Sequence, residues 1–332
     1  MRYNYDSLKR FACFFSVLYC LSVFSVSAQV NEINLINDTI QNHVTGGHVN
    51  IPGTRIYIEP PNGYTALSNG NGFIGNNSKI DFIDNIGRNY NIDSSSFNKK
   101  LMNKANLYFL DSKSITVSGY TGKLILADAP QNIRIYFIQF GDSTFSTMIT
   151  SYFFKGDSNS LYSLAKSINS IYYDINTKVN PLDAITFSLG DSLSKLKYIG
   201  QNEMFYTYTF EGLSEPQYAD IPTFRVAQLW NDQRQSARSF AKILQENNPY
   251  TPYQEYSIID SSTERISIYD SYQFTYSYKS ANSTKIVYCC IISTADYIYW
   301  MEGYTAVELD VTSQLSIFKD FAHTFHKINY LH

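Results

Sequence analysis

The chain has 332 residues, with 26 basic and 29 acidic side chains and a formal net charge of -3. This balance fits neither a basic nucleic-acid-binding protein nor an acidic disordered tail. Hydrophobic residues make up 44% of the sequence and include 29 Tyr and 22 Phe. Such a chain can bury a large core in one or two domains of roughly 100–200 residues each. We therefore expect a folded protein with no nucleic-acid partner.

The N-terminal segment has the pattern of an export signal. Three basic residues precede an apolar run over residues 11–26, and small residues lead up to an expected cleavage position after Ala28. A signal peptidase removes such a segment. The run is shorter than the about 20 residues that a membrane helix needs, and no second candidate follows. The sequence predicts a signal peptide over residues 1–28 and an exported chain, periplasmic or secreted, without a transmembrane segment.

Only two cysteines follow the expected cleavage position, and they are adjacent. Cys289 and Cys290 lie within an apolar run that favours a strand. Neighbouring residues of a strand point to opposite faces, so these thiols should not form a disulfide. We expect two small, apolar strand residues.

In chain order, residues 29–50 come first and show little periodicity, which predicts a flexible lead-in. A first series of strands and helices follows. Its last helix carries an apolar stripe and begins after capping side chains at residues 157–160. The predicted strands are residues 55–59, 79–86, 107–118, 122–127 and 133–154, the last broken near Gly141, and the predicted helices are residues 95–105 and 160–172.

A second series repeats this order. The predicted strands are residues 184–188, 204–210, 223–229, 256–259, 266–278, 285–292 and 297–302. A helix with Ala237, Phe240, Ala241 and Leu244 on one side follows the third strand, and a final helix carries Leu315, Phe318, Ala322 and Phe325. The final helix has the apolar spacing of the helix that ends the first series.

The two series are related by nearly constant offsets. The pairs are Leu161/Leu315, Leu164/Phe318 and Ile171/Phe325 at an offset of 154, and Tyr136/Tyr288 and Tyr152/Tyr304 at an offset of 152. A two-residue insertion between strand and helix reconciles the two values. The order and the period predict an internal duplication.

The short turns between successive strands determine the fold class. Strands joined in this way must mostly pair antiparallel, because a parallel pair needs a crossover of a dozen or more residues. We predict an α+β fold in which helices pack on the faces of antiparallel sheets, as two similar domains in tandem. The predicted domains are residues 51–174 and 183–330, separated by a segment that Asn176, Asn180 and Pro181 interrupt.

The opening of the first series supports a family resemblance. Residues 51–64 read Ile-Pro-Gly-Thr-Arg-Ile-Tyr-Ile-Glu-Pro-Pro-Asn-Gly-Tyr, and residues 117–124 contain Val-Ser-Gly and Gly-Lys-Leu. These segments resemble the PsbP-like fold, which the Mog family of nuclear-import factors shares. The resemblance covers residues 51–174 and, more faintly, 183–328, where the opening turn is missing. It implies an α/β/α sandwich and a binding or assembly protein without catalytic residues.

One motif suggests an enzyme. Residues 189–193, Leu-Gly-Asp-Ser-Leu, match the Gly-Asp-Ser-Leu block of SGNH-type esterases, and residues 320–323 resemble their Asp-x-x-His block. By that resemblance Ser192 is the nucleophile, His323 the general base, Asp320 its orienting acid and Asn231 an oxyanion donor.

Local patterns give these residues other roles. Asn231 stands where a helix needs its N-cap, and Asp320 and His323 fall on the polar side of the final helix. A second Gly-Asp-Ser, at residues 141–143, lies at a turn between strands. An SGNH fold also needs a parallel sheet, whereas residues 256–302 are strand after strand.

Other motifs have simpler structural explanations. Gly70, Gly72 and Gly75 match the dinucleotide fingerprint, but no helix follows them, and we expect a flexible turn. The pairs His43/His48 and His323/His326 lack an acidic or thiolate cluster, and a surface role fits them better than metal binding. Aromatic residues alternate along residues 272–278 and 297–300, which is typical either of sheet packing or of a ligand or partner groove. We predict no cofactor and no metal.

Together the patterns predict an exported, non-enzymatic protein that binds an unknown protein or small molecule in the cell envelope, as a binding or assembly factor. A structural spacer without a specific partner fits the same features. The alternative from a different class is the esterase built on Ser192.

Overall fold

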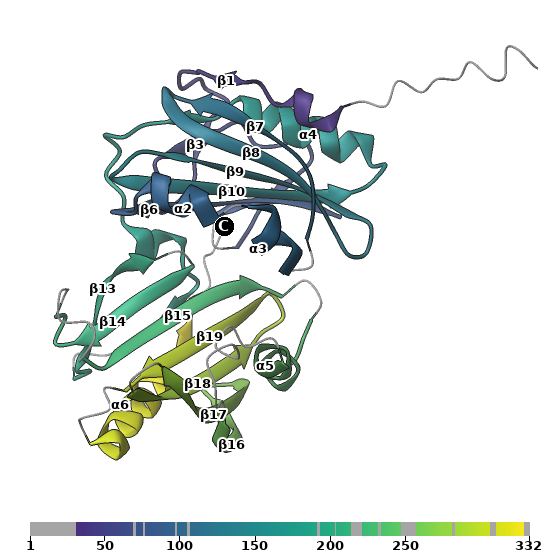
Figure 1. Ribbon diagram of the computed structural model, residues 1–332. Helices are drawn as coiled ribbons and strands as arrows, with labels where there is room; N and C mark the ends of the chain where they lie inside the picture. The colour runs from purple at the N-terminus through teal and green to yellow at the C-terminus, as the bar shows by residue number, and fades with distance from the viewer. Residues whose placement is uncertain are drawn as a thin grey trace, which may run out of the picture.

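The computed structural model describes residues 31–68, 71–75, 77–96, 98–104, 107–190, 193–202, 204–213, 221–231, 234–246, 257–280, 283–305 and 310–328. The predicted signal peptide lies outside these residues. Two units follow one another along the chain, each built on a large sheet with helices on its faces (Figure 1). The predicted α+β class is confirmed. None of the helices in the described part of the chain is long and apolar enough to span a membrane.

The first unit contains an eight-stranded sheet in the order β1-β7-β8-β9-β10-β6-β5-β4. Its strands are β1 (Thr39–Ile40), β4 (Thr65–Ala66), β5 (Gly72–Gly75), β6 (Ser78–Ile86), β7 (Tyr108–Val117), β8 (Tyr120–Ala129), β9 (Ile133–Gly141) and β10 (Phe145–Phe154). A small sheet joins β2 (Val49–Asn50), β3 (Ile56–Ile58) and β11 (Tyr172–Tyr173). The helices are η1 (Glu32–Leu35), α2 (Tyr90–Ser96), α3 (Lys99–Lys104) and α4 (Ser158–Asn169).

The second unit contains a seven-stranded sheet in the order β13-β14-β15-β19-β18-β17-β16. Its strands are β13 (Leu196–Asn202), β14 (Phe205–Phe210), β15 (Thr223–Trp230), β16 (Ser257–Ile266), β17 (Tyr269–Ser280), β18 (Ser283–Ser293) and β19 (Tyr297–Tyr304). A short pair joins β12 (Phe187–Ser188) to β20 (His326–Lys327). The helices are η2 (Pro181–Ala184), α5 (Ala237–Glu246) and α6 (Val311–His323).

Seven strands have the same spatial order in both units. Read from β7 to β4, the first sheet is matched strand for strand by the second sheet read from β16 to β13, and the small pair β3–β11 is matched by β12–β20. We call residues equivalent when they occupy the same place in the two units. The opening strand β3 is therefore matched by β12, which lies within the strand predicted at residues 184–188.

The register of pairing makes the equivalence residue-specific. Tyr136 faces Ser151 in the first unit, and Tyr288 faces Gly303 in the second, so both strands of each pair are shifted by 152 positions. In addition, β7 and β16 have a bulge at the same place, after Phe109 and after Ile258, which are 149 positions apart. Identical order, register and bulge confirm a repeated fold.

The closing helices form as their sequences predict. The Asp157 side chain accepts a hydrogen bond from the Ser160 backbone N–H at 3.1 Å, and the Asp310 side chain accepts one from the Thr312 N–H at 3.1 Å. Such caps satisfy amides of the first helical turn. Hydrogen bonds from Ser160 hold the pKa of Asp157 below its ordinary value. Along each helix the predicted apolar stripe faces the sheet, with Leu164 and Phe318 fully buried at equivalent places.

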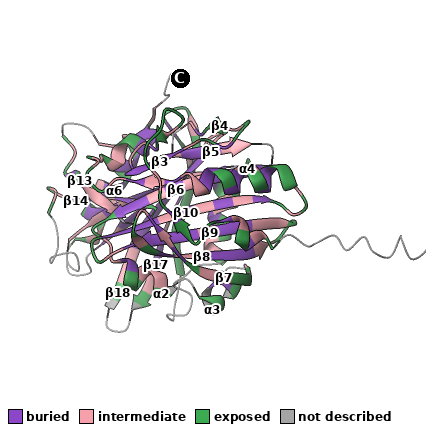
Figure 2. Ribbon diagram, turned by 90° about the horizontal axis from the view of Figure 1, so that it is seen from above, coloured by how far each residue is buried: buried purple, intermediate pink, exposed green. Residues whose placement is uncertain are grey.

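Each large sheet buries both of its faces, and Figure 2 shows the buried residues concentrated in its inner strands. In the second unit, Cys290 belongs to the core under α6 and Cys289 to the core under α5. Both thiols are free, as predicted. Burial raises the pKa of the Cys290 thiol to about 12, so these cysteines are inert packing residues.

Three predicted elements differ from the structure. The helix expected at residues 95–105 is two helices, the first beginning at Tyr90. The glycine-rich turn is partly a strand, since Gly72–Gly75 forms β5, although no helix follows it. The strand expected at residues 256–259 continues to Ile266. The prediction was too short because the second half of the strand is an exposed edge and lacks the apolar alternation that marks a strand.

The N-terminal segment also differs from its prediction. We expected a flexible lead-in at residues 29–50, yet Ile33, Ile36 and Ile40 are at most 2% exposed and belong to the core of the first unit. Strand β1 pairs with β7, and this pairing is parallel. The segment is packed because its isoleucines cover one end of the first sheet.

Gly303 shows how the two units repack one core position. An alanine Cβ at Gly303 would lie 2.3 Å from Cγ of Phe318. In the first unit the equivalent residues are Ser151 and Leu164. The unit with the smaller strand residue has the larger helix residue. We therefore expect the two positions to be energetically coupled.

We predict that Gly303→Ala lowers the free energy of unfolding by about 1–3 kcal/mol, because the methyl group overpacks the core. Phe318→Leu should relieve that clash, so the double variant should lose less than the two single variants added together. A double-mutant cycle measured by urea unfolding tests this expectation. Strictly additive losses would show that the positions do not repack each other.

Candidate functional site

The most buried charged group of the first unit has a structural role. Asp84 on β6 accepts hydrogen bonds from the Arg55 backbone N–H at 3.0 Å and from the Arg55 Nε at 2.8 Å. Thr147 donates to the same carboxylate at 2.9 Å, and the Arg55 guanidinium lies over the Phe145 ring. A buried charge is tolerated only when paired and hydrogen-bonded. The cluster therefore fixes the start of β3.

The second unit builds the same connection without charge. Gln228 on β15 is equivalent to Asp84, and its Oε1 accepts hydrogen bonds from the Thr186 backbone N–H at 2.7 Å and the Thr186 hydroxyl at 2.8 Å. Thr186 is equivalent to Arg55 and precedes β12. In both units, an inner strand thus supplies the acceptor for the opening strand's first N–H group.

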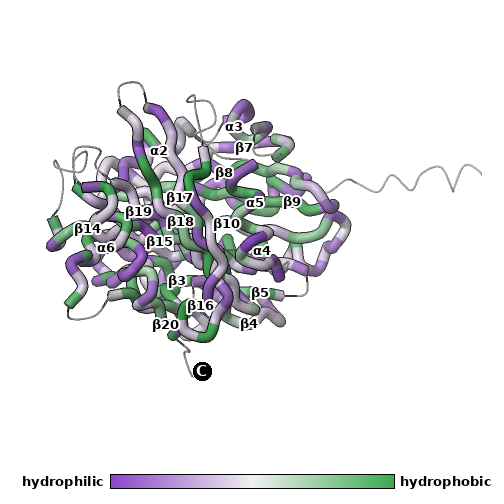
Figure 3. The backbone as a smooth tube through the Cα atoms, turned by 90° about the horizontal axis from the view of Figure 1, so that it is seen from below, coloured by the Kyte–Doolittle hydropathy of each residue, from purple (hydrophilic) through white to green (hydrophobic). Residues whose placement is uncertain are grey.

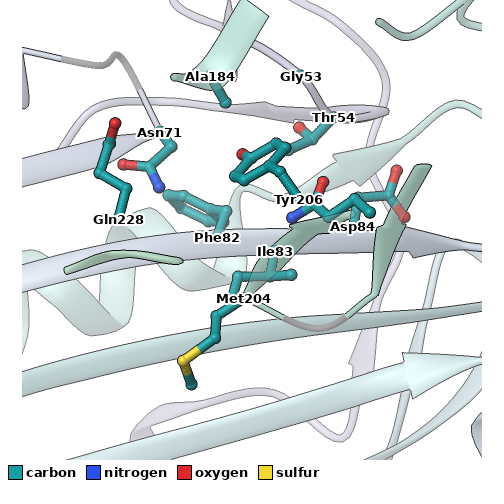
Figure 4. A pocket seen from close by; sticks show the side chains of 11 residues that line it. Gly53, Thr54, Asn71, Phe82, Ile83, Asp84, Ala184, Met204, Tyr206 and Gln228 are labelled. Atoms are coloured by element: carbon teal, nitrogen blue, oxygen red, sulfur yellow. The ribbon is translucent and has the colours of Figure 1, made fainter. Parts of the chain in front are cut away.

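A small pocket marks the junction between the units (Figure 4). Six of its lining residues form equivalent pairs: Gly53/Ala184, Asn71/Tyr206 and Asp84/Gln228. The two units thus meet through corresponding surfaces, as in a symmetric dimer. The cavity measures about 50 Å³, room for a few water molecules at most. We interpret it as a joint between the units.

The predicted esterase residues are Ser192, Asn231, Asp320 and His323, of which the structure describes the last three. Ser192 lies outside the described residues. Nearby, Gly190 donates its N–H to the Thr324 hydroxyl, and Leu193 and Ser194 line a pocket of about 380 Å³ with Asp320 of α6. Leu193 and Ser194 therefore lie near Asp320.

Asn231 is held in a separate network. It is 4% exposed, its Oδ1 accepts from the Gln235 N–H at 2.7 Å, and its Nδ2 donates to the Thr294 carbonyl at 3.0 Å. We expected Asn231 to be the N-cap of helix α5. That helix begins only at Ala237, so the expectation was wrong. Instead Asn231 joins the loop before α5 to the turn between β18 and β19.

His323 faces the far edge of the second sheet. Its Nε2 lies 3.3 Å from Oε1 of Glu264 on β16, and Lys319 reaches the same carboxylate at 3.5 Å. Asp320 and His323 are exposed, on the outer side of α6. Within the described part of the chain, no hydrogen bond joins Asn231, Asp320 and His323.

Two further motifs have local roles. Asp142 of the second Gly-Asp-Ser accepts hydrogen bonds from the Thr144 N–H and hydroxyl in the turn between β9 and β10. These bonds lower the pKa of Asp142. The alternating aromatics pack within the second unit, where Phe274 and Tyr276 are 3% exposed beside α5. Sheet packing thus accounts for these rings.

The two units differ most at one sheet edge. In the first unit, the outer edge of β7 is covered by β1, with Thr39 opposite Thr116 and Ile40 opposite Val117. Helix η1 continues this cover over β7 and β8. Beneath it lie Ile115, Leu124 and Leu126, which are at most 5% exposed.

In the second unit, the equivalent edge is β16. No described strand pairs with its outer side, and its first nine residues are exposed or half-buried. Strand β16 lies at the end of the molecule away from the first sheet (Figure 1) and at the surface in the view from below (Figure 3). A long uncovered edge carries unpaired backbone groups that can add another strand.

The floor beside this edge is polar where the first unit is apolar. The equivalents of Ile115, Leu124 and Leu126 are Glu264, Gln273 and Thr275. Next to them is a groove of about 310 Å³ between β16, β17 and α6. It is lined by Asp260, Ser261, Ser262, Gln273, Phe274, Thr275, Tyr288, Leu315, Ser316 and Lys319. We take the outer edge of β16 and this groove together as the candidate site, the β16 groove.

The sequence pattern does not reveal the β16 groove. The polar half of β16 resembles a loop, and Gln273 lies between the alternating aromatic residues of 272–278. The available signal was the second copy of the motif at residues 109–112, since Phe-Leu-Asp-Ser is repeated as Ile-Ile-Asp-Ser at residues 258–261.

Comparison with known proteins gives distant similarities. No protein-family model and no curated protein matches this chain. LpqN of Mycobacterium tuberculosis, involved in cell envelope biogenesis, is 10% identical over 42% of this chain and 81% of its own, with a TM-score of 0.31. PsbP (CyanoP) from Synechocystis sp. PCC 6803 is 9% identical over 46% of this chain and 98% of its own, with a TM-score of 0.29.

A third solved structure is the T6SS immunity protein TplEi from Pseudomonas aeruginosa. It is 7% identical over 85% of this chain and 97% of its own, with a TM-score of 0.29. These values describe distant similarity, and none of the three assigns a function to this chain.

The equivalent acceptors Asp84 and Gln228 allow a matched stability test. Asp84→Ala should cost about 3–5 kcal/mol, because it leaves the buried Arg55 guanidinium without its counter-charge. Gln228→Ala should cost about 1–3 kcal/mol, because it leaves only neutral donors unpaired. Urea unfolding of the two variants measures both losses. A larger loss for Gln228→Ala would contradict the role given to the ion pair.

Proposed function

We propose that this chain is an exported, non-enzymatic binding or assembly factor of the cell envelope, built from two PsbP-like domains at residues 51–174 and 183–330. The observation that carries the proposal is the difference between the two units at one sheet edge. The first unit covers this edge with its own chain, whereas in the second no described strand pairs with the outer edge of β16, which lies beside a polar groove. A repeated fold that keeps one edge open has a surface for a protein partner.

The sequence before the described residues supports export. A basic start, an apolar run and small residues before position 29 are the features that a signal peptidase recognises. If the segment is processed as proposed, the exported protein begins at Gln29. N-terminal sequencing of the protein recovered from the periplasm or medium tests this, and an intact Met1 terminus on the exported protein would contradict it.

The described polar residues support binding over catalysis. Asn231 is hydrogen-bonded to the turn between β18 and β19, and His323 Nε2 lies close to the Glu264 carboxylate. An acyl-transfer mechanism needs the nucleophile, its base and an oxyanion donor to converge on one reacting atom. His323 and Asn231 instead take part in two separate networks.

The decisive experiment measures binding and hydrolysis on the same protein. We expect the mature chain to form a saturable complex with one envelope protein that survives size-exclusion chromatography, and Ser192→Ala to leave that complex unchanged. Turnover of p-nitrophenyl butyrate should be equal for the wild type, Ser192→Ala and His323→Ala. Loss of turnover in both variants, in a protein that binds no partner, would refute the proposal in favour of the esterase.

A further inference from the structure

The first unit shows how this sheet edge holds an extended segment. On α4, the Asn169 Oδ1 accepts from the Asn37 backbone N–H at 2.8 Å, and its Nδ2 donates to the Leu35 carbonyl at 2.8 Å. From the sheet, Lys113 Nζ donates to the Ile36 carbonyl at 2.5 Å. The Tyr136 hydroxyl donates to the carbonyl of residue 32 at 2.6 Å. These contacts grip backbone atoms, so they do not depend on the side chains of the held segment.

The edge strand supplies two further hydrogen bonds. Thr116 donates its backbone N–H to the Asp38 carbonyl at 2.8 Å, and Ser118 donates to the Ile40 carbonyl at 2.8 Å. The segment thereby becomes a parallel strand at the edge of the sheet. Main-chain bonding of this kind is how an extended peptide adds to a sheet.

The β16 groove keeps three of these positions, whereas Ser262 stands in the place of Lys113. Arg265 is equivalent to Thr116, so its N–H points away from β17, outward from the edge. His323 on α6 is equivalent to Asn169, and Tyr288 is equivalent to Tyr136. In the second unit the Tyr288 hydroxyl donates to Gln273 Oε1 at 2.7 Å, where Tyr136 donates to a backbone carbonyl of the held segment.

Gln273 gives an independent indication of an absent acceptor. The residue is 3% exposed and lines the groove, and its Nε2 has no hydrogen-bond partner among the described residues. Leaving a buried amide donor unpaired is unfavourable. The equivalent residue of the first unit is Leu124, which needs no partner. A carbonyl group of a bound peptide would satisfy this donor.

Resting on the proposed function, we propose that the β16 groove binds an extended segment of the partner protein as a parallel strand added to β16. His323 takes the place of Asn169 beside the backbone of the segment, and Gln273 Nε2 donates to one of its carbonyl groups. The bound segment has polar side chains where it passes over Gln273 and Thr275. In the first unit the equivalent residues are leucines, which share a hydrophobic core with Ile33 and Ile36 of the held segment.

Photo-crosslinking in the native cell envelope tests the geometry. A photoreactive benzoylphenylalanine replaces Ser261 or Arg265, which lie four positions apart on one side of β16. The matched controls replace Ser112 and Thr116, the equivalent residues of β7. We expect the Thr116 control to crosslink within the chain near Thr39 and the Ser112 control to crosslink about four residues before it, and the β16 probes to crosslink to the partner.

Mass spectrometry then gives the direction of the bound segment. Both β16 probes should reach one continuous segment, with the residue crosslinked from Ser261 about four positions N-terminal to that crosslinked from Arg265. The opposite order, or two unconnected segments, would overturn the parallel-strand proposal. Crosslinks to a partner from other surfaces only would overturn it too and leave the proposed function standing. No partner from any surface would refute both.

Backbone and side-chain variants separate specific from general effects. Arg265→Pro removes the outward N–H of the edge strand, where proline is tolerated, and should lower the Ser261 crosslink yield about tenfold, while Arg265→Ala stays within about twofold. His323→Ala should lower the yield about fivefold, whereas His323→Asn restores the Asn169-like contact and the yield. Unchanged thermal unfolding midpoints verify folding. Equal yields for Arg265→Pro and Arg265→Ala would overturn the role of the edge N–H.

Discussion

Each unit depends on a side chain that reaches from an inner strand to the first N–H group of the opening strand. Asp84 accepts this bond from Arg55, and Gln228 accepts it from Thr186. A buried N–H group without an acceptor is strongly disfavoured, so the opening strand can lie against the closing helix only if the inner strand provides one. Because both acceptors also line the junction pocket, the same contact aligns the two units.

Duplication provides a comparison within a single molecule. Equivalent residues share the same backbone geometry, so a change of chemistry between them reflects a change of local demand. In the core, the first unit pairs Ser151 with Leu164, and the second unit pairs Gly303 with Phe318. Side-chain volume thus moves from the strand to the helix without a change of fold. At the edge, Leu124 becomes Gln273, and an apolar floor becomes polar. The first change preserves packing, whereas the second gives the groove floor hydrogen-bonding groups, of which Gln273 Oε1 accepts from the Tyr288 hydroxyl.

The sequence predicted the parts of the fold that have strong periodicity. The apolar stripes of α4 and α6, the capping residues of α4 and the antiparallel pairing follow from local patterns, and the fold class is confirmed. The burial of Ile33, Ile36 and Ile40 was missed. Their spacing matches an apolar helical face, but they stand among polar residues, and the segment forms only the short helix η1 and the strand β1. The polar half of β16 was missed for a related reason: an edge strand that covers no core has no apolar alternation.

The candidate site shows the same limit from the chemical side. His323 attracts attention because histidine is common in catalysis, and the Asp-x-x-His spacing strengthens that interpretation. Sequence spacing alone does not show that the equivalent position on α4 is Asn169, whose amide holds a passing backbone. Imidazole and carboxamide share the ability to donate to a carbonyl oxygen, but only imidazole can act as a general base at neutral pH. The role proposed for His323, which Asn169 fills in the first unit, therefore requires hydrogen bonding and not proton transfer.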